Sequence, residues 1–291
     1  MESDNQLSGI VWLNGELTDY SSGKISVTDR GFNFGDGVYE VIRVYNSKPF
    51  AMDRHLKRLE RSAAGVELSL PMPIEEIAGL ATELTKKSTL PSAEIYIQLT
   101  RGAAPRNHLF PNGAQPTFLI GVRQGRQVPA ELIQTGCSVI TRPDERWARC
   151  NLKTICLLPN VLAKEAAHRA GAAEAILIRD GLITEGTSSN VFIWEGGRLS
   201  TPIADNRILP GITREIAIEL ATKLGYEVAE RDIRVDEMFA AGEVFLTGTT
   251  LELLPVVTID DRLIGNGRPG DVRGDLHAAF ADMIERNSKA G

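Results

Sequence analysis

One lysine, Lys153, stands in the stretch RWARCNLKTICLLPN, residues 146–160, among apolar and small polar residues and with no acidic residue close behind it. Lysine is seldom buried, because its charged amine is strongly hydrated. If this stretch is a buried strand, the loss of hydration favours the neutral amine, which can attack a carbonyl group or move a proton. On this stretch alone, the alternative is a lysine whose stem is buried while its amine reaches solvent.

Glu185 lies in ITEGTSSN, where a predicted strand ends and a run of hydroxyl residues begins. A carboxylate in this position is suited to hold the protonated ring nitrogen of a heterocyclic cofactor. The alternative is an ordinary turn, for which Glu-Gly followed by Thr and Ser is typical.

Three segments contain residue types that bind phosphate groups. GITREIAIEL begins a predicted helix after Pro210, so the backbone amides of Ile212 and Thr213 lie at the positive end of the helix dipole. TGTT, residues 247–250, offers hydroxyl groups beside a glycine. Arg58, in DRHLKRLERS, is either a solvated helix arginine or a partner for a phosphate dianion. Each segment is also compatible with a purely structural role.

Two further segments are suited to contact a small ligand. Tyr39 follows a loop with three glycines, GFNFGDG, and begins a predicted strand, so its hydroxyl could lie over a ligand. Arg106 and His108 alternate in PRNHLF, within the long loop RGAAPRNHLFPNGAQP. In an extended conformation both side chains face the same way and could clamp a carboxylate.

Taken together, these motifs resemble a known family. Gly-Asp-Gly-Val-Tyr-Glu, His-x-x-Arg-Leu, an isolated lysine about a hundred residues later, Thr-Glu-Gly-x-Ser-Ser-Asn, Gly-Ile-Thr-Arg and Thr-x-Thr-Thr occur in one order between about Val11 and Phe280. The chain is therefore similar to the fold type IV pyridoxal-phosphate enzymes. The Arg-x-His loop makes the resemblance closest to the D-amino acid aminotransferases.

The resemblance implies a role for each candidate residue. Lys153 would form the internal aldimine with pyridoxal 5′-phosphate and act as the proton shuttle, and Glu185 would pair with the pyridine nitrogen. Tyr39 would lie beside the cofactor and the substrate. Arg106 and His108 would bind the substrate carboxylate, reaching in from the neighbouring subunit of a homodimer. The phosphate would be bound by Arg58, the amides of Ile212 and Thr213, and Thr249.

The activity implied is transfer of an amino group from a D-amino acid, such as D-alanine, to a 2-oxo acid, such as 2-oxoglutarate. The same resemblance leaves open a branched-chain L-amino acid aminotransferase, an (R)-amine transaminase or aminodeoxychorismate lyase. Thr187 and Gly248 stand where D-amino acid members of the family carry serine, which affects the expected substrate range. A lysine Schiff-base aldolase is disfavoured because the strands and helices do not alternate as in a (β/α)₈ barrel. A non-catalytic binding protein would have to combine six ordered motifs by chance.

The length of 291 residues predicts two domains. We expect a small α/β domain over residues 1–124, carrying Tyr39, Arg58 and the Arg106/His108 loop. The second domain, residues 125–291, is expected to be larger and strand-rich, of pseudo-barrel type, which gives a mixed α+β fold. Asn14-Gly15 predicts a hairpin. Further strands are predicted at 38–45, 94–100, 117–123, 137–141, 174–179, 182–184, 190–194, 243–247 and 256–260, and helices at 53–66, 73–84, 159–170, 211–225 and 272–286.

Composition excludes several other classes. The net charge of −6, with no basic block, argues against a nucleic-acid partner. Neither a signal peptide nor a membrane span is visible, which predicts a cytoplasmic protein. Three scattered cysteines and four histidines without ligand spacing predict no metal site and no disulfide framework.

Overall fold

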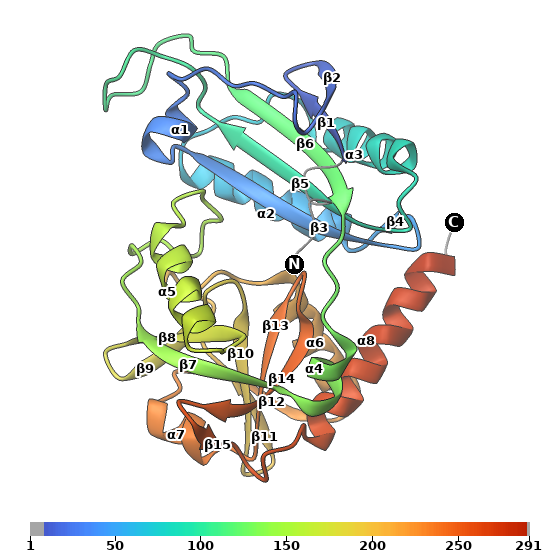
Figure 1. Cartoon of the computed structure of the whole chain (residues 1–291), viewed down its shortest axis with the longest axis vertical. Coiled ribbons are helices and arrows are strands. Elements are labelled where there is room, and N and C mark those ends of the chain that lie inside the picture. Colours follow the sequence, from blue (N-terminus) through green and yellow to red (C-terminus); the bar gives the residue numbers. More distant parts are fainter. Residues whose placement is uncertain (1–8, 290–291) are drawn as a thin grey trace. The chain divides into compact units, whose positions relative to one another are not determined.

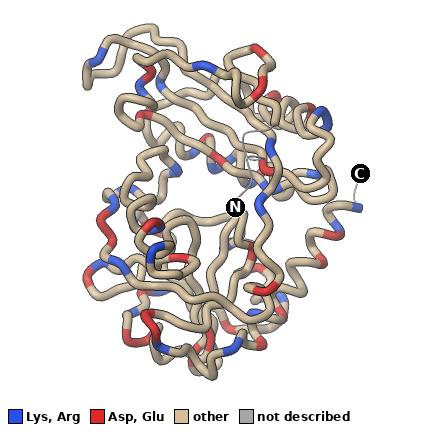
Figure 2. Tube along the Cα trace, in the orientation of Figure 1, with Lys and Arg blue, Asp and Glu red and all other residues tan. Residues whose placement is uncertain are grey.

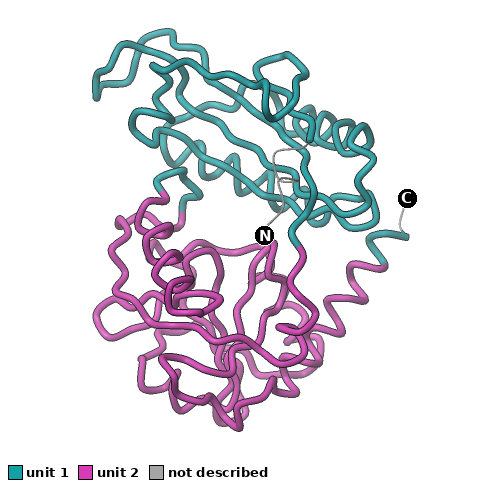
Figure 3. The backbone as a smooth tube through the Cα atoms, in the orientation of Figure 1, with its two compact units in different colours: residues 1–126, 152–156, 286–291 teal, residues 127–151, 157–285 magenta. Residues whose placement is uncertain are grey.

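The computed structural model describes residues 9–289, which fold into two compact units (Figure 3). Unit 1 comprises Met1–Arg126, Leu152–Cys156 and Arg286–Gly291, and unit 2 comprises Gln127–Asn151 and Leu157–Glu285. The prediction from the sequence kept Lys153 with the second domain. The structure instead groups the short segment that carries Lys153 with unit 1, because its backbone pairs with a strand of that unit.

Unit 1 is built on a six-stranded antiparallel sheet with the strand order β2-β1-β6-β5-β3-β4 (Figure 1). Its first hairpin turns at Asn14-Gly15, as predicted, and both residues have positive φ angles, 49° and 102°. The strands are β1 (Gly9–Leu13), β2 (Glu16–Asp19), β3 (Gly37–Tyr45), β4 (Lys48–Pro49), β5 (Ser92–Thr100) and β6 (Thr117–Gln124).

Two helices, α2 (Met52–Gly65) and α3 (Ile74–Ser88), share one apolar core with alternate residues of this sheet. Burying a leucine or isoleucine side chain contributes about 1.5–3 kcal/mol, and β5 alone buries three such residues completely. Those residues are Ile95, Ile97 and Leu99.

Helix α2 begins one residue before the predicted helix 53–66, and no side chain caps it. The chain turns at Ala51, whose φ of 53° is left-handed, and the helix begins at Met52, so Asp53 lies in the first turn and does not cap it. The glycine-rich stretch GFNFGDG, residues 31–37, was expected to be a loop, but its first residues belong to a short helix, α1 (Arg30–Phe34).

The segment Leu152–Cys156 runs along the free edge of β3. The Tyr39 amide donates to the Lys153 carbonyl at 3.0 Å, and the Ile155 amide donates to the Gly37 carbonyl at 3.1 Å. A single isolated antiparallel β-bridge, between Val38 and Thr154, joins this segment to β3. Lys153 therefore lies in irregular backbone beside a strand and not within a buried strand.

Unit 2 contains a curled, nine-stranded mixed sheet of half-barrel form, with the order β12-β11-β10-β13-β14-β7-β8-β9 and β15 paired to β14 (Figure 1). The pairs β7–β8, β7–β14 and β11–β12 are parallel. The predicted strand-rich second domain, and with it the mixed fold class, is confirmed. The strands are β7 (Cys137–Pro143), β8 (Glu174–Arg179), β9 (Leu182–Gly186), β10 (Asn190–Glu195), β11 (Arg198–Thr201), β12 (Glu227–Glu230), β13 (Glu243–Gly248), β14 (Glu252–Ile259) and β15 (Arg262–Leu263).

Five helices accompany this sheet: α4 (Ala130–Thr135), α5 (Leu158–Arg169), α6 (Ile212–Lys223), α7 (Val235–Ala240) and α8 (Asp271–Lys289). The three long ones match the predicted helices 159–170, 211–225 and 272–286 within a few residues. Basic and acidic residues are interspersed along both units (Figure 2). Within residues 9–289, no helix has the length and apolar content that crossing a membrane requires.

Candidate functional site

Lys153 is half-buried, and its amine lies against an aromatic ring. Lys153 Nζ is 4.3 Å from the centre of the Tyr39 ring, a cation–π distance when the amine is protonated. The Lys153 amide donates to Ser62 Oγ on α2 at 3.1 Å. Among residues 9–289, no carboxylate forms an ion pair with this lysine. The main chain therefore fixes the lysine at the start of β3, while its amine is not held by an acid.

Arg58 is buried and grips Glu40, a residue that the sequence reasoning did not single out. Arg58 Nε donates to Glu40 Oε1 at 2.7 Å, and Arg58 Nη2 donates to Glu40 Oε2 at 2.9 Å. His55 Nδ1 lies 2.8 Å from Glu40 Oε2 and must be the donor, because an ionised carboxylate only accepts. The signal for Glu40 was present: it alternates with Val38 and Ile42 on the core-facing side of β3, where a charge needs a partner.

The electrostatics of this cluster keep Glu40 ionised. Burial alone raises the pKa of Glu40, but the charge of Arg58 and the hydrogen bonds from His55 and Arg58 outweigh it and hold the pKa far below its ordinary value. Burial lowers the pKa of His55, and the nearby positive charges of Arg58 and Lys153 act in the same direction. A neutral histidine and one arginine thus face one carboxylate.

Arg106 and His108 lie on the exposed loop between β5 and β6, and both contact Phe34 at the end of α1. The Arg106 guanidinium is 4.9 Å from the centre of the Phe34 ring, and the His108 ring meets it edge-on at 5.5 Å. Arg30 of the same helix donates to the carbonyl of Leu109 at 3.3 Å and is anchored by Asp36 at 2.7 Å. The long loop is therefore tied to α1, and its two basic side chains stand on one aromatic ring.

Glu185, at the end of β9, is buried in unit 2 and surrounded by donors. Oε2 accepts from Asn190 Nδ2 at 3.0 Å, and the Leu209 amide lies 3.1 Å from both carboxylate oxygens. Arg146 forms an ion pair with Oε1. Burial raises the pKa of Glu185 against the opposing effects of Arg146 and the Leu209 amide. The carboxylate has about four acceptor positions and three donors, namely Asn190, Leu209 and Arg146. One position can therefore accept from a further N–H donor when the Leu209 amide binds only one of the two oxygens.

Arg146 is a further residue that sequence reasoning passed over, although it begins the stretch that holds Lys153. Its side chain is only 6% exposed, and it bridges Glu185 to a second buried carboxylate, Asp144. Asp144 lies two residues earlier and accepts from Arg146 Nε and Nη2, both at 2.9 Å. The Asp-x-Arg spacing was the available signal, because a short acidic side chain readily binds a group two residues on.

The hydroxyl run after Glu185 packs around a third buried acid, Glu174. Thr187 donates its hydroxyl to Glu174 Oε1, and Ser188 donates to Oε2 at 3.3 Å. Thr187 supplies the hydroxyl that this contact needs. Much of the run therefore builds the turn itself.

Helix α6 begins without a side-chain cap, at Gly211. Ile212 and Thr213 occupy its first turn and are buried, 4% and 6% exposed. A Cβ atom on Gly211 would lie 2.1 Å from Asn190 Oδ1, so a larger residue would displace the Asn190 side chain where the helix meets β10. The first turn of α6 is thus next to the residue that donates to Glu185.

The TGTT segment forms the end of β13 and the turn after it. Thr249 is half-buried in that turn. Thr247 is 1% exposed and pairs with Asn190 across the sheet, yet within the described residues its hydroxyl has no hydrogen-bond partner. At Gly248 an added Cβ would come within 3.3 Å of the Ser188 carbonyl, so a side chain at this position would fit tightly.

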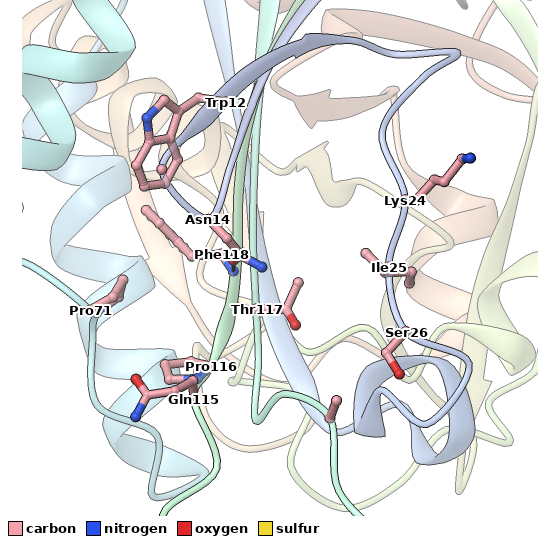
Figure 4. Close-up of a pocket in the computed structure, with 12 residues that line it drawn as sticks. Trp12, Asn14, Lys24, Ile25, Ser26, Pro71, Gln115, Pro116, Thr117 and Phe118 are labelled. Carbon is pink, nitrogen blue, oxygen red and sulfur yellow. Dashed lines mark hydrogen bonds between the residues drawn. The ribbon is translucent and has the colours of Figure 1, made fainter.

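A cavity of about 540 Å³ lies elsewhere in unit 1 (Figure 4). Trp12 and Phe118 line it on the strand side, and Lys24, Ile25 and Ser26 line it on the opposite side. Its lining contains none of the site residues predicted from the sequence.

Comparison with known proteins identifies a family. The family model described as "Amino-transferase class IV" matches residues 37–259. The chain is 41% identical over 279 residues to a D-alanine aminotransferase of Bacillus licheniformis, covering 94% of this chain and 96% of that protein. It is 38% identical over 278 residues to a D-alanine aminotransferase of Staphylococcus haemolyticus, covering 96% and 99%.

Solved structures agree on the fold. The branched-chain amino acid aminotransferase of Escherichia coli superposes with a TM-score of 0.89 at 29% identity, over 95% of both chains. A second branched-chain amino acid aminotransferase, from T.th. and solved with pyridoxamine 5′-phosphate, gives a TM-score of 0.89 at 29% identity, over 96% of this chain and 95% of that chain.

Proposed function

The chain belongs to the class IV aminotransferase family, a group of pyridoxal-phosphate-dependent transaminases, and we propose that it moves the amino group of a D-amino acid, such as D-alanine, to a 2-oxo acid, such as 2-oxoglutarate. The observation that carries this proposal is the likeness to D-alanine aminotransferases over nearly the whole length of both chains. The Arg106/His108 pair on Phe34 supports it, because an arginine with a second basic group suits an amino acid carboxylate.

The described residues fit pyridoxal phosphate. The start of α6 at Gly211 has no side-chain cap, so the amides of Ile212 and Thr213 suit a phosphate group. The hydroxyl of Thr247 on β13 has no hydrogen-bond partner among residues 9–289, which supports a polar ligand near the end of that strand. Thr249 and Arg58 are the further phosphate-binding residues of the proposal. Glu185, with its raised pKa, suits a cationic ring N–H. When bound, the cofactor supplies an electron sink for the charge left as a Cα proton departs.

Each remaining role falls to a side chain of this protein. Lys153 would bind the cofactor through its amine and, once displaced by the substrate, take the proton from the substrate Cα atom, a step that contributes about 10²–10⁴-fold in rate. Tyr39 would keep that amine beside the start of β3, as its ring contact suggests. Arg106 and His108 would orient the carboxylate and so select which Cα bond is broken.

We further infer that the protein acts as a homodimer in which this loop serves the neighbouring subunit. Phe32 on α1, and Leu109 and Phe110 on the loop tied to that helix, are 73%, 75% and 53% exposed. Exposed large apolar side chains on neighbouring segments are typical of surfaces that a partner covers. A cytoplasmic location remains a prediction from the sequence.

The test of the function is direct. Purified protein should be yellow after incubation with pyridoxal phosphate, and borohydride treatment followed by mass spectrometry should find the cofactor on Lys153. Protein that stays colourless would refute the central claim. A Lys153→Ala variant should bind the cofactor without covalent attachment and lose transamination.

The branched-chain L-aminotransferase remains the second candidate, because solved enzymes of that class share the fold at TM-scores of 0.89. Assays with D-alanine, L-leucine and a chiral amine as donors separate the possibilities. Turnover of L-leucine above D-alanine would replace the proposed donor.

A further inference from the structure

A single guanidinium, that of Arg146, is divided between two buried carboxylates in unit 2. Its Nε and Nη2 atoms bind Asp144, and its Nη1 atom binds Glu185. Asp144 also accepts from Thr184 Oγ1 at 2.9 Å and from Arg179 Nη2 at 3.1 Å. No other ion pair to Glu185 occurs among the residues that the structure describes.

Sharing the guanidinium has an electrostatic consequence. An arginine that faced Glu185 alone would neutralise it, and the carboxylate would have little attraction left for another cation. Because Arg146 donates two of its N–H groups to Asp144 and one to Glu185, Glu185 is only partly compensated, in a buried site where charge effects are strong. The hydrogen bonds and charge of Arg146 and the hydrogen bond from Thr184 outweigh burial and lower the pKa of Asp144, so it carries its charge at neutral pH.

We propose that Asp144 is a positioning residue for Glu185, which acts through Arg146 to keep Glu185 able to hold a cationic N–H group. This inference rests on the proposed function for its ligand, the ring nitrogen of the cofactor. The charge relation between Asp144 and Glu185 is a property of this chain itself and is measurable without the cofactor. Of the other nearby titratable groups, burial raises the pKa of the Cys150 thiol, so it stays neutral at neutral pH.

The chain contains a matched control for Asp144. Asp205 and Arg207 repeat the Asp-x-Arg arrangement: Arg207 donates its amide to Asp205 Oδ1 at 2.8 Å and its Nε to Asp205 Oδ2 at 2.9 Å. Arg207 directs its side chain to Asp232 and not to Glu185. The Arg207 carbonyl accepts from Arg146 Nη2 at 3.1 Å, and Asp205→Asn keeps that backbone group in place. The variant therefore alters a similar side-chain pair of the same unit while both carboxylate partners of Arg146 remain.

The first experiment uses cofactor-free full-length protein with ¹³C-labelled glutamate carboxylates, in which Glu185→Gln assigns the signal. Asp144→Asn should let Arg146 serve Glu185 alone, so Glu185 should titrate at lower pH than in the wild type. Asp205→Asn should leave that titration unchanged. An unchanged titration in Asp144→Asn would overturn the inference, whether or not the cofactor binds.

A second variant predicts the opposite sign. Arg179→Gln removes the second cation that binds Asp144. Asp144 then interacts more strongly with Arg146, less of the positive charge compensates Glu185, and Glu185 should titrate at higher pH. Arg179 is the more exposed partner, with 22% of its side chain accessible, so this variant keeps the test open if Asp144→Asn does not fold. A shift in the same direction as Asp144→Asn, or none, would contradict the proposal.

With the cofactor, the readout is the ¹⁵N chemical shift of ring-labelled pyridoxal phosphate. In Asp144→Asn the ring nitrogen should lose its proton at lower pH than in the wild type, and the Kd for the cofactor should rise about three- to tenfold, up to the factor that one pKa unit represents. A wild type that fails to bind the cofactor refutes the proposed function. A wild type that binds it while Asp144→Asn keeps the wild-type ¹⁵N profile refutes only the role of Asp144.

Discussion

Glu40 and Arg58 show how much a single buried charge depends on its partner. Both side chains are almost inaccessible, and the pair is held by two parallel hydrogen bonds. Glu40→Ala leaves the guanidinium uncompensated inside unit 1, so the free energy of unfolding should fall by about 3–5 kcal/mol. Urea unfolding followed by circular dichroism measures this loss.

The surface pair Glu83 and Lys87 on α3 provides the comparison. Its side chains are about half exposed, and its 2.7 Å contact spans one helical turn. Because solvent screens such a pair, Glu83→Gln should leave the unfolding midpoint nearly unchanged. If Glu83→Gln lowered the free energy of unfolding as much as Glu40→Ala, burial would not determine how much an ion pair contributes to stability.

The stability that Glu40 supplies should depend on pH in a defined direction. Its pKa is lowered in the folded protein from an ordinary value of 4.5, so below about pH 4.5 the unfolded chain takes up a proton that the folded protein does not. The advantage of the wild type over Glu40→Gln should therefore be complete above pH 4.5 and shrink as the pH falls. An advantage that grows on acidification would contradict the assigned direction.

Arg106 should act on substrate binding and leave the cofactor in place. Arg106→Leu removes a charged donor for a carboxylate, and hydrogen bonds to charged groups are worth about 1.5–3 kcal/mol, so the KM for D-alanine should rise roughly ten- to hundredfold. The absorbance of the bound cofactor should change little. If Arg106→Leu weakened cofactor binding as much as D-alanine binding, the role of Arg106 would be structural.

Arg262 is the control for this substitution. Its guanidinium also lies over an aromatic ring, 4.8 Å from Phe239, on an exposed segment of unit 2. Arg262→Leu should keep the wild-type KM for D-alanine.

At the scale of elements, the start of α6 depends on a close approach. Gly211 has an ordinary φ of −73°, so alanine there creates no backbone strain, and the clash with Asn190 is the only cost. We expect Gly211→Ala to displace Asn190 from Glu185 and to raise the Kd for pyridoxal phosphate about tenfold, the effect of one hydrogen bond to a charged group. Fluorescence titration of the cofactor-free protein measures this.

Gly274 in α8 is the matched position. An added Cβ there meets no atom within 4 Å, so Gly274→Ala should leave cofactor affinity unchanged and stabilise the protein by about 0.5–1 kcal/mol. A similar loss of affinity in both variants would remove the contact with Asn190 as the explanation.

Elements with a clear repeat were predictable, and those set by their neighbours were not. The predicted strands that correspond to β3, β5 and β6, and the predicted helices that correspond to α5, α6 and α8, agree with the observed bounds within a few residues. Helix α1 was missed because its five residues lie in a glycine-rich stretch, which is typical of a loop. Its N-terminus is capped by Asp29, which accepts from the Gly31 amide at 2.8 Å.

The site followed the same division. Motif residues such as Lys153 and Glu185 stand out in the sequence, whereas their supports come from distant parts of the chain. The irregular backbone at Lys153 is set by the edge of β3, more than a hundred residues earlier, which no local pattern reports. Arg146 is near Lys153 in sequence, but its partner Glu185 is 39 residues away.

At the scale of the whole molecule, the proposed homodimer makes a prediction that single variants cannot test. If the Arg106 loop serves the neighbouring subunit, each site combines Lys153 of one protomer with Arg106 of the other. In a heterodimer of Lys153→Ala and Arg106→Leu chains, one site then carries both substitutions and the other carries neither.

Mixing the two weakly active variants, after unfolding and refolding together to exchange subunits, should therefore restore activity at low D-alanine concentration. A heterodimer has one intact site out of two, and random pairing makes half of all dimers heterodimers, so the mixture should reach about a quarter of the wild-type activity per site. If Arg106 instead serves its own protomer, every site in the mixture keeps one of the two substitutions and no activity returns. A tagged heterodimer purified from the mixture distinguishes these outcomes, because its activity per dimer should be half that of the wild type in the first case and close to zero in the second.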